Sequence, residues 1–142
     1  MLHLIKLCVG CDSLEDLAAW QKQRLKEKKA KGQKPELVHI TRQTPKRDVE
    51  LLDGGSLYWV IKGQIAARQT LTELRAMRVK GMPHCGLVLH KILVPLRPRP
   101  RSAFQGWRYL EAADAPSDLT AAKDDKNLPE ALRRELAALG LL

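Results

Sequence analysis

The sequence predicts an α+β domain built on a mixed, mostly antiparallel, curled sheet, with one helix near the N-terminus, one short helix and one C-terminal helix. Three patterns lead to this class. Helically spaced apolar residues follow a first strand-like run, consecutive strand-like runs divided by Gly and Pro fill the middle, and a second helical pattern closes the chain. Consecutive strands disfavour repeated βαβ units. At 142 residues, we expect a single domain spanning 1–142.

The N-terminal third predicts two strands and two helices. The first run is dense in Leu, Ile and Val, which is typical of a strand buried on both faces. Ser13 offers an N-cap oxygen to the helix that follows, and Pro45 is suited to the first position of a short helix. The expected elements are a strand at 2–9, a helix at 13–30, a strand at 38–42 and a helix at 45–52.

The middle of the chain predicts a meander of short strands. Gly63 and Gln64 lie where a tight hairpin turn is expected, and the prolines of 95–101 favour an extended segment that cannot be a central strand. Polar residues at 111–127 predict a loop or a weakly ordered segment. The expected elements are strands at 56–62, 65–75, 85–90, 92–96 and 106–110, a loop at 79–83, and a closing helix at 127–140.

The excess positive charge lies within the predicted sheet. Between Arg42 and Arg108 there are thirteen Lys or Arg and four Asp or Glu, a difference of +9 that equals the net charge of the whole chain. A fixed positive field on a folded surface is what a polyanionic partner requires. We therefore expect a nucleic-acid-binding module, with structured or single-stranded RNA favoured over duplex DNA.

Several segments resemble a known family. They include Leu4-Ile-Lys-Leu-Cys-Val-Gly10, Thr44-Pro-Lys-Arg47, Leu51-Leu-Asp-Gly-Gly-Ser-Leu-Tyr-Trp-Val-Ile-Lys-Gly63 and Phe104-Gln-Gly-Trp-Arg-Tyr-Leu110. Over nearly its full length the chain looks like a member of domain of unknown function 1489, a family of short alphaproteobacterial proteins. The resemblance implies a bacterial cytosolic protein and implies no particular activity.

A looser likeness is to the PUA-like group, which includes the ASCH and EVE domains. These are small curled β-barrels with an early helix and a Gly-containing hairpin, here Trp59-Val-Ile-Lys-Gly63 leading to Arg68. The usual ASCH pattern has a Lys and a Glu after the glycine, and neither is present at 64–68. This likeness implies a PUA-like barrel and rests on element order and one hairpin.

Two basic and aromatic segments are the candidate RNA-binding residues. Arginine and lysine neutralise phosphates, and aromatic faces stack on unpaired bases. Burial of the rings in the core is the alternative, most of all for Trp59 and also for Trp107. The candidate phosphate contacts are Arg68, Arg97, Arg99, Arg101 and Arg108, aided by Lys62, Arg42, Lys46 and Arg47. The candidate stacking residues are Tyr58, Phe104, Trp107 and Tyr109.

The segment Pro98-Arg-Pro-Arg101 has two readings. In an extended chain Arg97, Arg99 and Arg101 are spaced by about 6–7 Å, close to the phosphate repeat of a single strand. RNA affinity would then fall when these three arginines are replaced by Ala. The alternative is a rigid connector whose arginines pair with acids near Glu111 and Asp114.

The cysteines give a weak metal pattern. Cys8 and Cys11 are spaced like zinc ligands, and Cys85 follows His84, but a second Cys-x-x-Cys or His-x-x-His pair is missing. Cys8 at the end of an apolar strand fits a small buried side chain better. No metal and no cofactor is therefore expected.

Two other function classes stay open. A small hydrolase acting on a modified nucleoside or nucleotide would use Lys62, Thr70 and Glu73 in a pocket of about 300 Å³ or more. An interaction module for an acidic protein is the other. We expect a cytoplasmic protein without a membrane contact, because the chain has no apolar run of about 18 residues and no signal peptide at its start.

Overall fold

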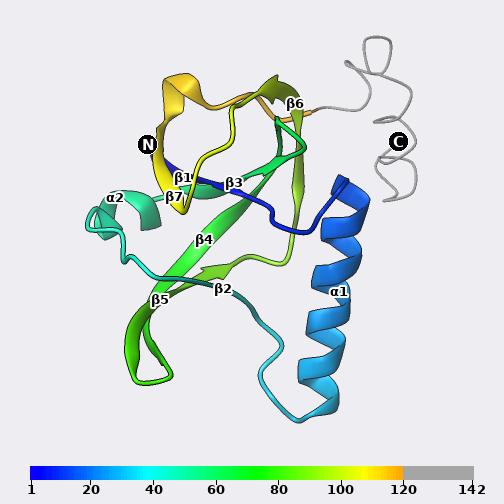
Figure 1. Ribbon diagram of the computed structural model, residues 1–142, viewed down its shortest axis with the longest axis vertical. Helices are drawn as coiled ribbons and strands as arrows, with labels where there is room; N and C mark the ends of the chain where they lie inside the picture. The colour runs from blue at the N-terminus through cyan, green and yellow to red at the C-terminus, as the bar shows by residue number, and fades with distance from the viewer. Residues whose placement is uncertain (120–142) are drawn as a thin grey trace.

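The structure, a computed structural model, describes residues 1–119 (Figure 1). Within them the chain folds into a seven-stranded sheet with two α-helices and one 3-10 turn. The elements in chain order are β1 (Leu2–Leu7), α1 (Leu14–Ala30), β2 (Leu37–Thr41), α2 (Asp48–Leu52), β3 (Ser56–Ile61), β4 (Gln64–Val79), β5 (Met82–Leu89), β6 (Val94–Pro100), β7 (Trp107–Glu111) and η1 (Ala112–Asp114).

The sheet is mixed and curled but not closed, which confirms the predicted class in its coarse form. Its strand order is β2-β5-β4-β3-β1-β7, with β6 paired to β4. Only the β1–β3 pair is parallel. The long strand β4 crosses the middle of the molecule, pairing with β3 and β6 through its first half and with β5 through its second (Figure 1). The strands β2 and β7 are the two ends of the sheet.

The central strands are buried on both faces, as predicted for the first strand. Leu4 and Leu57 belong to a large apolar cluster, whereas Ile5 and Tyr58 belong to a second cluster on the other side. Alternate residues of a strand point to opposite faces, so β1 and β3 each supply both clusters. This explains their nearly continuous apolar sequence.

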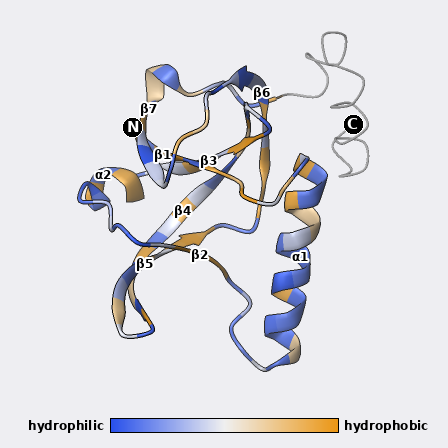
Figure 2. Cartoon of the chain, viewed as in Figure 1, coloured by the Kyte–Doolittle hydropathy of each residue, from blue (hydrophilic) through white to orange (hydrophobic). Residues whose placement is uncertain are grey.

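Helix α1 begins as predicted and lies beside the sheet. Ser13 caps it, because the Ser13 hydroxyl accepts a hydrogen bond of 3.0 Å from the Asp16 amide. Its buried side chains are Leu14, Leu17 and Gln21, all in the first half. The second half is largely hydrophilic (Figure 2).

Two tight hairpins differ from the predicted boundaries. Lys62 and Gly63 form the β3–β4 turn, one residue earlier than expected, and Lys80 and Gly81 form the β4–β5 turn where a loop at 79–83 was predicted. All four residues have positive φ, between 48° and 78°. Such pairs match the twist of antiparallel strands, so β4 continues to Val79 instead of ending near residue 75.

The short helix starts later than Pro45. Arg47 has φ −91° and ψ 51°, which is outside the helical region, and α2 therefore begins at Asp48. The amides of Lys46 and Arg47 instead donate hydrogen bonds of 3.0 and 3.2 Å to the Tyr109 hydroxyl. The loop 42–47 is thereby attached to β7.

The proline-rich segment is an edge strand. As expected, it is extended and not central, because β6 pairs with β4 alone among the named strands, and this permits prolines without a donor. The predicted strand at 92–96 starts at Val94 and includes these prolines. The predicted loop at 111–127 is wrong at its start, because Glu111 ends β7 and Ala112–Asp114 form η1. Further on, Ser117 and Leu119 pack along β6 through hydrogen bonds to Arg97 and Pro95. The predicted closing helix lies outside the described residues.

Candidate nucleic-acid interface

A lysine lies between two tryptophans on the concave face of the sheet. In the strand register, Lys6 of β1 is paired with Trp59 of β3 on one side and with Trp107 of β7 on the other. Paired residues point to the same face, so the Lys6 side chain leaves the sheet between the side chains of Trp59 and Trp107. Burial lowers the pKa of Lys6 from its ordinary value. Lys6 is thus a half-buried cation at the inner surface of the sheet.

The two end strands of the sheet face each other without pairing and form a seam. The Trp107 indole donates a hydrogen bond of 2.9 Å to the Gln43 carbonyl. The Tyr109 hydroxyl accepts hydrogen bonds from the amides of Lys46 and Arg47 in the same loop. Trp107 and Tyr109 contact each other edge to face, with ring centroids 4.9 Å apart. Their polar atoms therefore fasten loop 42–47 to β7 and leave the seam open beside them.

The opening is a cavity of about 640 Å³, which we call the seam groove. Its charged lining residues are Lys6, Arg42 and Arg108, which come from β1, from the loop that follows β2 and from β7. Among the residues that the structure describes, no carboxylate forms an ion pair with any of the three. The groove is lined by Lys6, Ile40, Thr41, Arg42, Gln43, Gln105, Gly106, Trp107 and Arg108.

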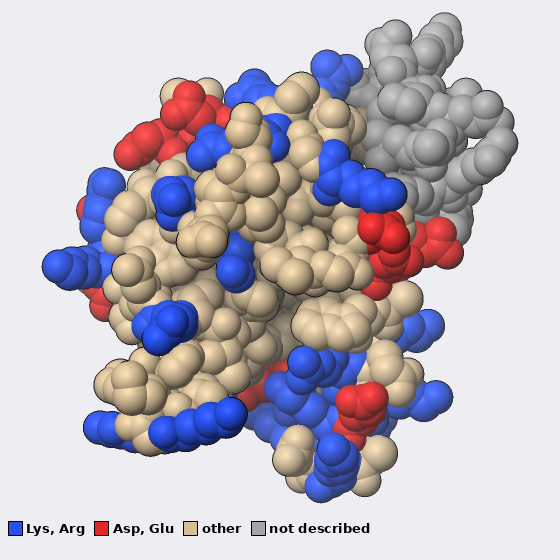
Figure 3. Space-filling view, viewed as in Figure 1, with Lys and Arg blue, Asp and Glu red and all other residues tan. Residues whose placement is uncertain are grey.

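A basic and aromatic cluster adjoins the groove. The guanidinium groups of Arg101 and Arg108 lie 5.1 and 5.5 Å from the centre of the Phe104 ring, within cation–π distance. Arg108 also donates a hydrogen bond of 2.8 Å to the Gln105 carbonyl. In the space-filling view of this side, Lys and Arg are spread over the face and acidic groups lie mainly toward its margins (Figure 3).

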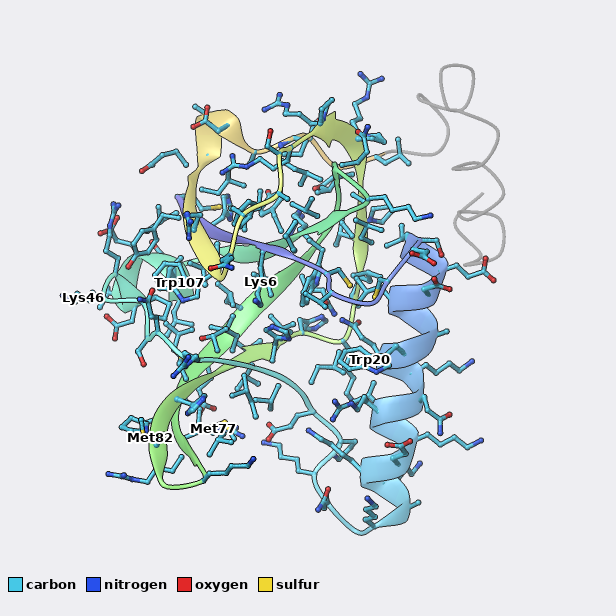
Figure 4. The ribbon with its side chains drawn as sticks, viewed as in Figure 1. Lys6, Trp20, Lys46, Met77, Met82 and Trp107 are labelled. Carbon is cyan, nitrogen blue, oxygen red and sulfur yellow. The ribbon has the colours of Figure 1, made fainter. Side chains whose placement is uncertain are left out.

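A second cavity, of about 480 Å³, shares Lys6 with the seam groove, and we call it the Trp20 pocket. Trp20 of α1 is 48% exposed, and Arg24 stacks on its ring at 4.8 Å. Figure 4 shows Lys6 between Trp107 on one side and Trp20 on the other. The pocket is lined by Lys6, Leu7, Cys8, Val9, Gly10, Cys11, Asp16, Leu17, Trp20, His39 and Trp59.

His39, one of the residues that line this pocket, has a buried polar atom. Its ring meets Trp59 edge to face at 5.2 Å. Its Nε2 atom is buried, and it is the only buried side-chain nitrogen or oxygen in the described part of the chain without a hydrogen-bond partner. A buried polar atom without a partner is costly, and in native proteins it usually has a ligand or a water.

We expect His39 to make the protein less stable at acidic pH. Burial, with the positive charges of Lys6 and Arg24, lowers its pKa to about 4. Because an unfolded His has a pKa near 6.5, the unfolded state binds more protons between these values, and stability decreases as the pH falls through that window. Urea unfolding measures how far the free energy of unfolding decreases between pH 7.5 and pH 4.5. This decrease should be about 2 kcal/mol smaller in His39→Gln than in the wild type. Equal losses would contradict a neutral His39.

Some predicted phosphate contacts are engaged by carboxylates. Arg68 binds Asp118 with two hydrogen bonds of 2.7 Å and also donates to Ser56. Arg47 pairs with Glu50 at 2.6 Å, and the exposed Lys62 lies 3.9 Å from an Asp12 oxygen. These three cations lie outside the seam groove, and their neighbouring acids screen them from a polyanion.

The remaining candidates divide between the groove and β6. Arg42, Arg108 and Trp107 line the groove, and Arg101 and Phe104 adjoin it. Arg97 and Arg99 are exposed on β6, and Arg99 donates to the backbone carbonyl of Asp114, not to a carboxylate. Lys46 is exposed in loop 42–47 beside Tyr109.

Tyr58 is excluded as a stacking residue, which corrects the prediction. Only 4% of it is exposed, because it points into the second apolar cluster, where its ring meets His3 at 4.9 Å. Trp59 is buried as expected at 2% exposure, yet its ring also forms a wall of the Trp20 pocket.

The weak catalytic and metal candidates are not assembled. Lys62 occupies the β3–β4 turn, whereas Thr70 pairs with Ser56 at the opposite end of β3, and Glu73 is bound to Arg75. Neither the seam groove nor the Trp20 pocket contains any of the three.

Cys85 does not lie with the other two cysteines. Cys8 and Cys11 adjoin each other at the Trp20 pocket, and burial raises the pKa of Cys8. Cys85 is wholly buried in β5. No cluster of three metal-binding side chains occurs within 1–119.

Sequence reasoning missed three residues of this interface. Lys6 is in phase with Leu2 and Leu4 on a buried strand, and a charge in that phase was the available signal. His39 lies two residues after Leu37 in β2, so both side chains point to the inner face of the sheet. Trp20 lies outside the basic stretch between Arg42 and Arg108. Which of these side chains meet depends on how the two ends of the sheet curl together.

The chain belongs to the family described as "Protein of unknown function (DUF1489)", which matches residues 4–142. No curated protein and no solved structure matches it. Among the described residues, no helix is long and apolar enough to cross a membrane.

Proposed function

We propose that this protein binds RNA through the seam groove, with Lys6, Arg42 and Arg108 contacting phosphates. The observation that carries the proposal is the meeting of three cations from two strands and the loop after β2 around one cavity, without an acidic partner among the described residues. Lys6 is half-buried, and a partly desolvated cation attracts an anion more strongly than a fully solvated one, whereas Arg42 and Arg108 are exposed. A phosphate near Lys6 would also restore the charge that burial disfavours.

The shape of the site favours a single strand. The groove is a recess in the seam of a curled sheet, and such a recess suits one sugar-phosphate chain better than the broad surface of a duplex. The Trp107 ring lines it, and the cluster of Arg101, Phe104 and Arg108 extends it. Alternation of cations and aromatic rings is typical of proteins that bind unpaired nucleic acid.

We expect salt-dependent RNA binding that depends on the groove. Three phosphate contacts on a single strand predict a log–log salt slope of about −2, or a loss of about 20-fold in affinity between 50 and 200 mM salt. Each of three groove variants should bring the slope closer to zero by about 0.7. The variants are Lys6→Met, Arg42→Ala and Arg108→Ala. Fluorescence anisotropy with an unstructured eight-nucleotide RNA measures both quantities.

The matched control is Lys91→Ala, which removes one exposed positive charge outside the groove. It should leave the slope unchanged. A slope that responds to Arg99→Ala and not to the three groove variants would move the interface to β6. Absence of salt-dependent binding would reject the proposal, and an acidic protein partner that binds equally well with competitor RNA would favour the interaction-module alternative.

We also propose that the fold is PUA-like and that the protein acts in the bacterial cytoplasm. The early helix, the curled sheet and the tight β3–β4 hairpin leading to Arg68 support the likeness. The missing Lys and Glu after Gly63 set the chain apart from the ASCH pattern.

A further inference from the structure

The Trp20 pocket has the size and lining of a site for one planar heteroaromatic group. Its volume of about 480 Å³ lies in the range of small-molecule sites. Trp59 and Leu17 supply buried apolar walls, and the half-exposed Trp20 stands at the rim with Arg24 on its ring. Flat apolar walls and a few polar atoms are what a nucleobase requires.

The residues that line the pocket also include two polar side chains, His39 and Asp16. The His39 Nε2 atom is buried without a hydrogen bond among the described residues, and a neutral imidazole offers either a donor or an acceptor there. Asp16 is exposed at the side of the pocket, although its carboxylate already accepts a hydrogen bond from the Asp12 amide. The edge of a base has donors and acceptors of the same kinds.

The two cavities share Lys6, and this links the pocket to the groove. A strand whose phosphates lie along Lys6, Arg42 and Arg108 passes directly beside the pocket, so a base rotated out of the stack can enter it. We propose that the Trp20 pocket receives one unpaired nucleobase of the bound RNA, with His39 Nε2 as a hydrogen-bond partner of the base edge. This inference rests on the proposed function.

The test compares an eight-nucleotide mixed-sequence RNA with a ribose-phosphate oligomer of the same length that has no bases. The wild type should bind the base-bearing oligomer about tenfold more tightly, as expected for one stacked base. His39→Leu and Trp20→Ala should each reduce this ratio toward one and leave the salt slope unchanged. Because Trp20 is half exposed, Trp20→Ala decides the matter if His39→Leu does not fold.

His84→Leu is the matched control, since His84 lies on β5 outside both cavities, and it should keep the full ratio. Equal affinity for the two oligomers with an intact salt slope overturns the base pocket and leaves RNA binding standing. A ratio that survives both Trp20→Ala and His39→Leu also overturns it, because the bases then stack elsewhere. Loss of salt-dependent binding to both oligomers rejects the proposed function as well.

Discussion

Replacing Gly55 with alanine is expected to destabilise the protein by about 3 kcal/mol or more. A Cβ atom on Gly55 would lie far inside van der Waals contact of the carbonyl oxygens of Leu2 and Leu51. Both atoms are backbone, and neither can rotate away. Gly55 also donates to the Leu51 carbonyl and accepts from the Leu71 amide, both at 2.9 Å. Urea denaturation followed by circular dichroism measures the loss.

Gly86→Ala is the control for this substitution. A Cβ atom there would meet Met77 Sδ at 2.5 Å and Val38 Cγ1 at 2.9 Å. Methionine is flexible, and Met77 lies on the hairpin at the edge of the molecule (Figure 4), so its side chain can move aside. Val38 is stiffer and must also shift, so the expected cost is about 1–2 kcal/mol, still below that for Gly55. Equal losses for the two variants would show that the segment around Gly55 adjusts more easily than its contacts indicate.

The sequence allowed the elements with strong local signals to be predicted. The Ser13 cap, the apolar strands β1 and β3, and the edge position of the prolines all follow from chemistry within a few residues. The Lys80–Gly81 turn was missed because it lacks the Asn-Gly or Asp-Gly pair that marks such turns, although lysine adopts positive φ there.

The candidate site was predicted only in part, for a physical reason. Charge density pointed to the stretch from Arg42 to Arg108, but it did not distinguish Arg68, which Asp118 neutralises, from Arg42 and Arg108, which border the seam. That distinction depends on contacts between residues far apart in sequence. Lys6 became visible as a site residue only when the register placed it between Trp59 and Trp107.

Replacing Gln69 with leucine is expected to cost about 3 kcal/mol or more, although leucine is similar in size. The Gln69 side chain is wholly buried and makes four hydrogen bonds. Its amide nitrogen donates to Gln21 Oε1 at 2.8 Å and to the His90 carbonyl at 3.1 Å. Its oxygen accepts from Gln21 Nε2 at 2.7 Å and from the Trp59 indole at 2.9 Å. Leucine leaves the Gln21 amide and the Trp59 indole buried and unsatisfied, and it removes the bond to the carbonyl of the exposed His90.

The same substitution tests whether the network positions the Trp20 pocket. Gln21 anchors α1 to the sheet and Trp59 is a wall of the pocket, so Gln69→Leu should also reduce the preference for a base-bearing oligomer over an abasic one. The Gln21→Leu/Gln69→Leu double variant should lose less stability than the sum of the single variants, because two unsatisfied amides disappear together. Gln23→Leu, on the exposed side of α1, should change stability by about 0.5 kcal/mol or less. Additive losses in the double variant would mean that the two glutamines act independently, and the base preference would then have to come from Trp20 and His39 alone.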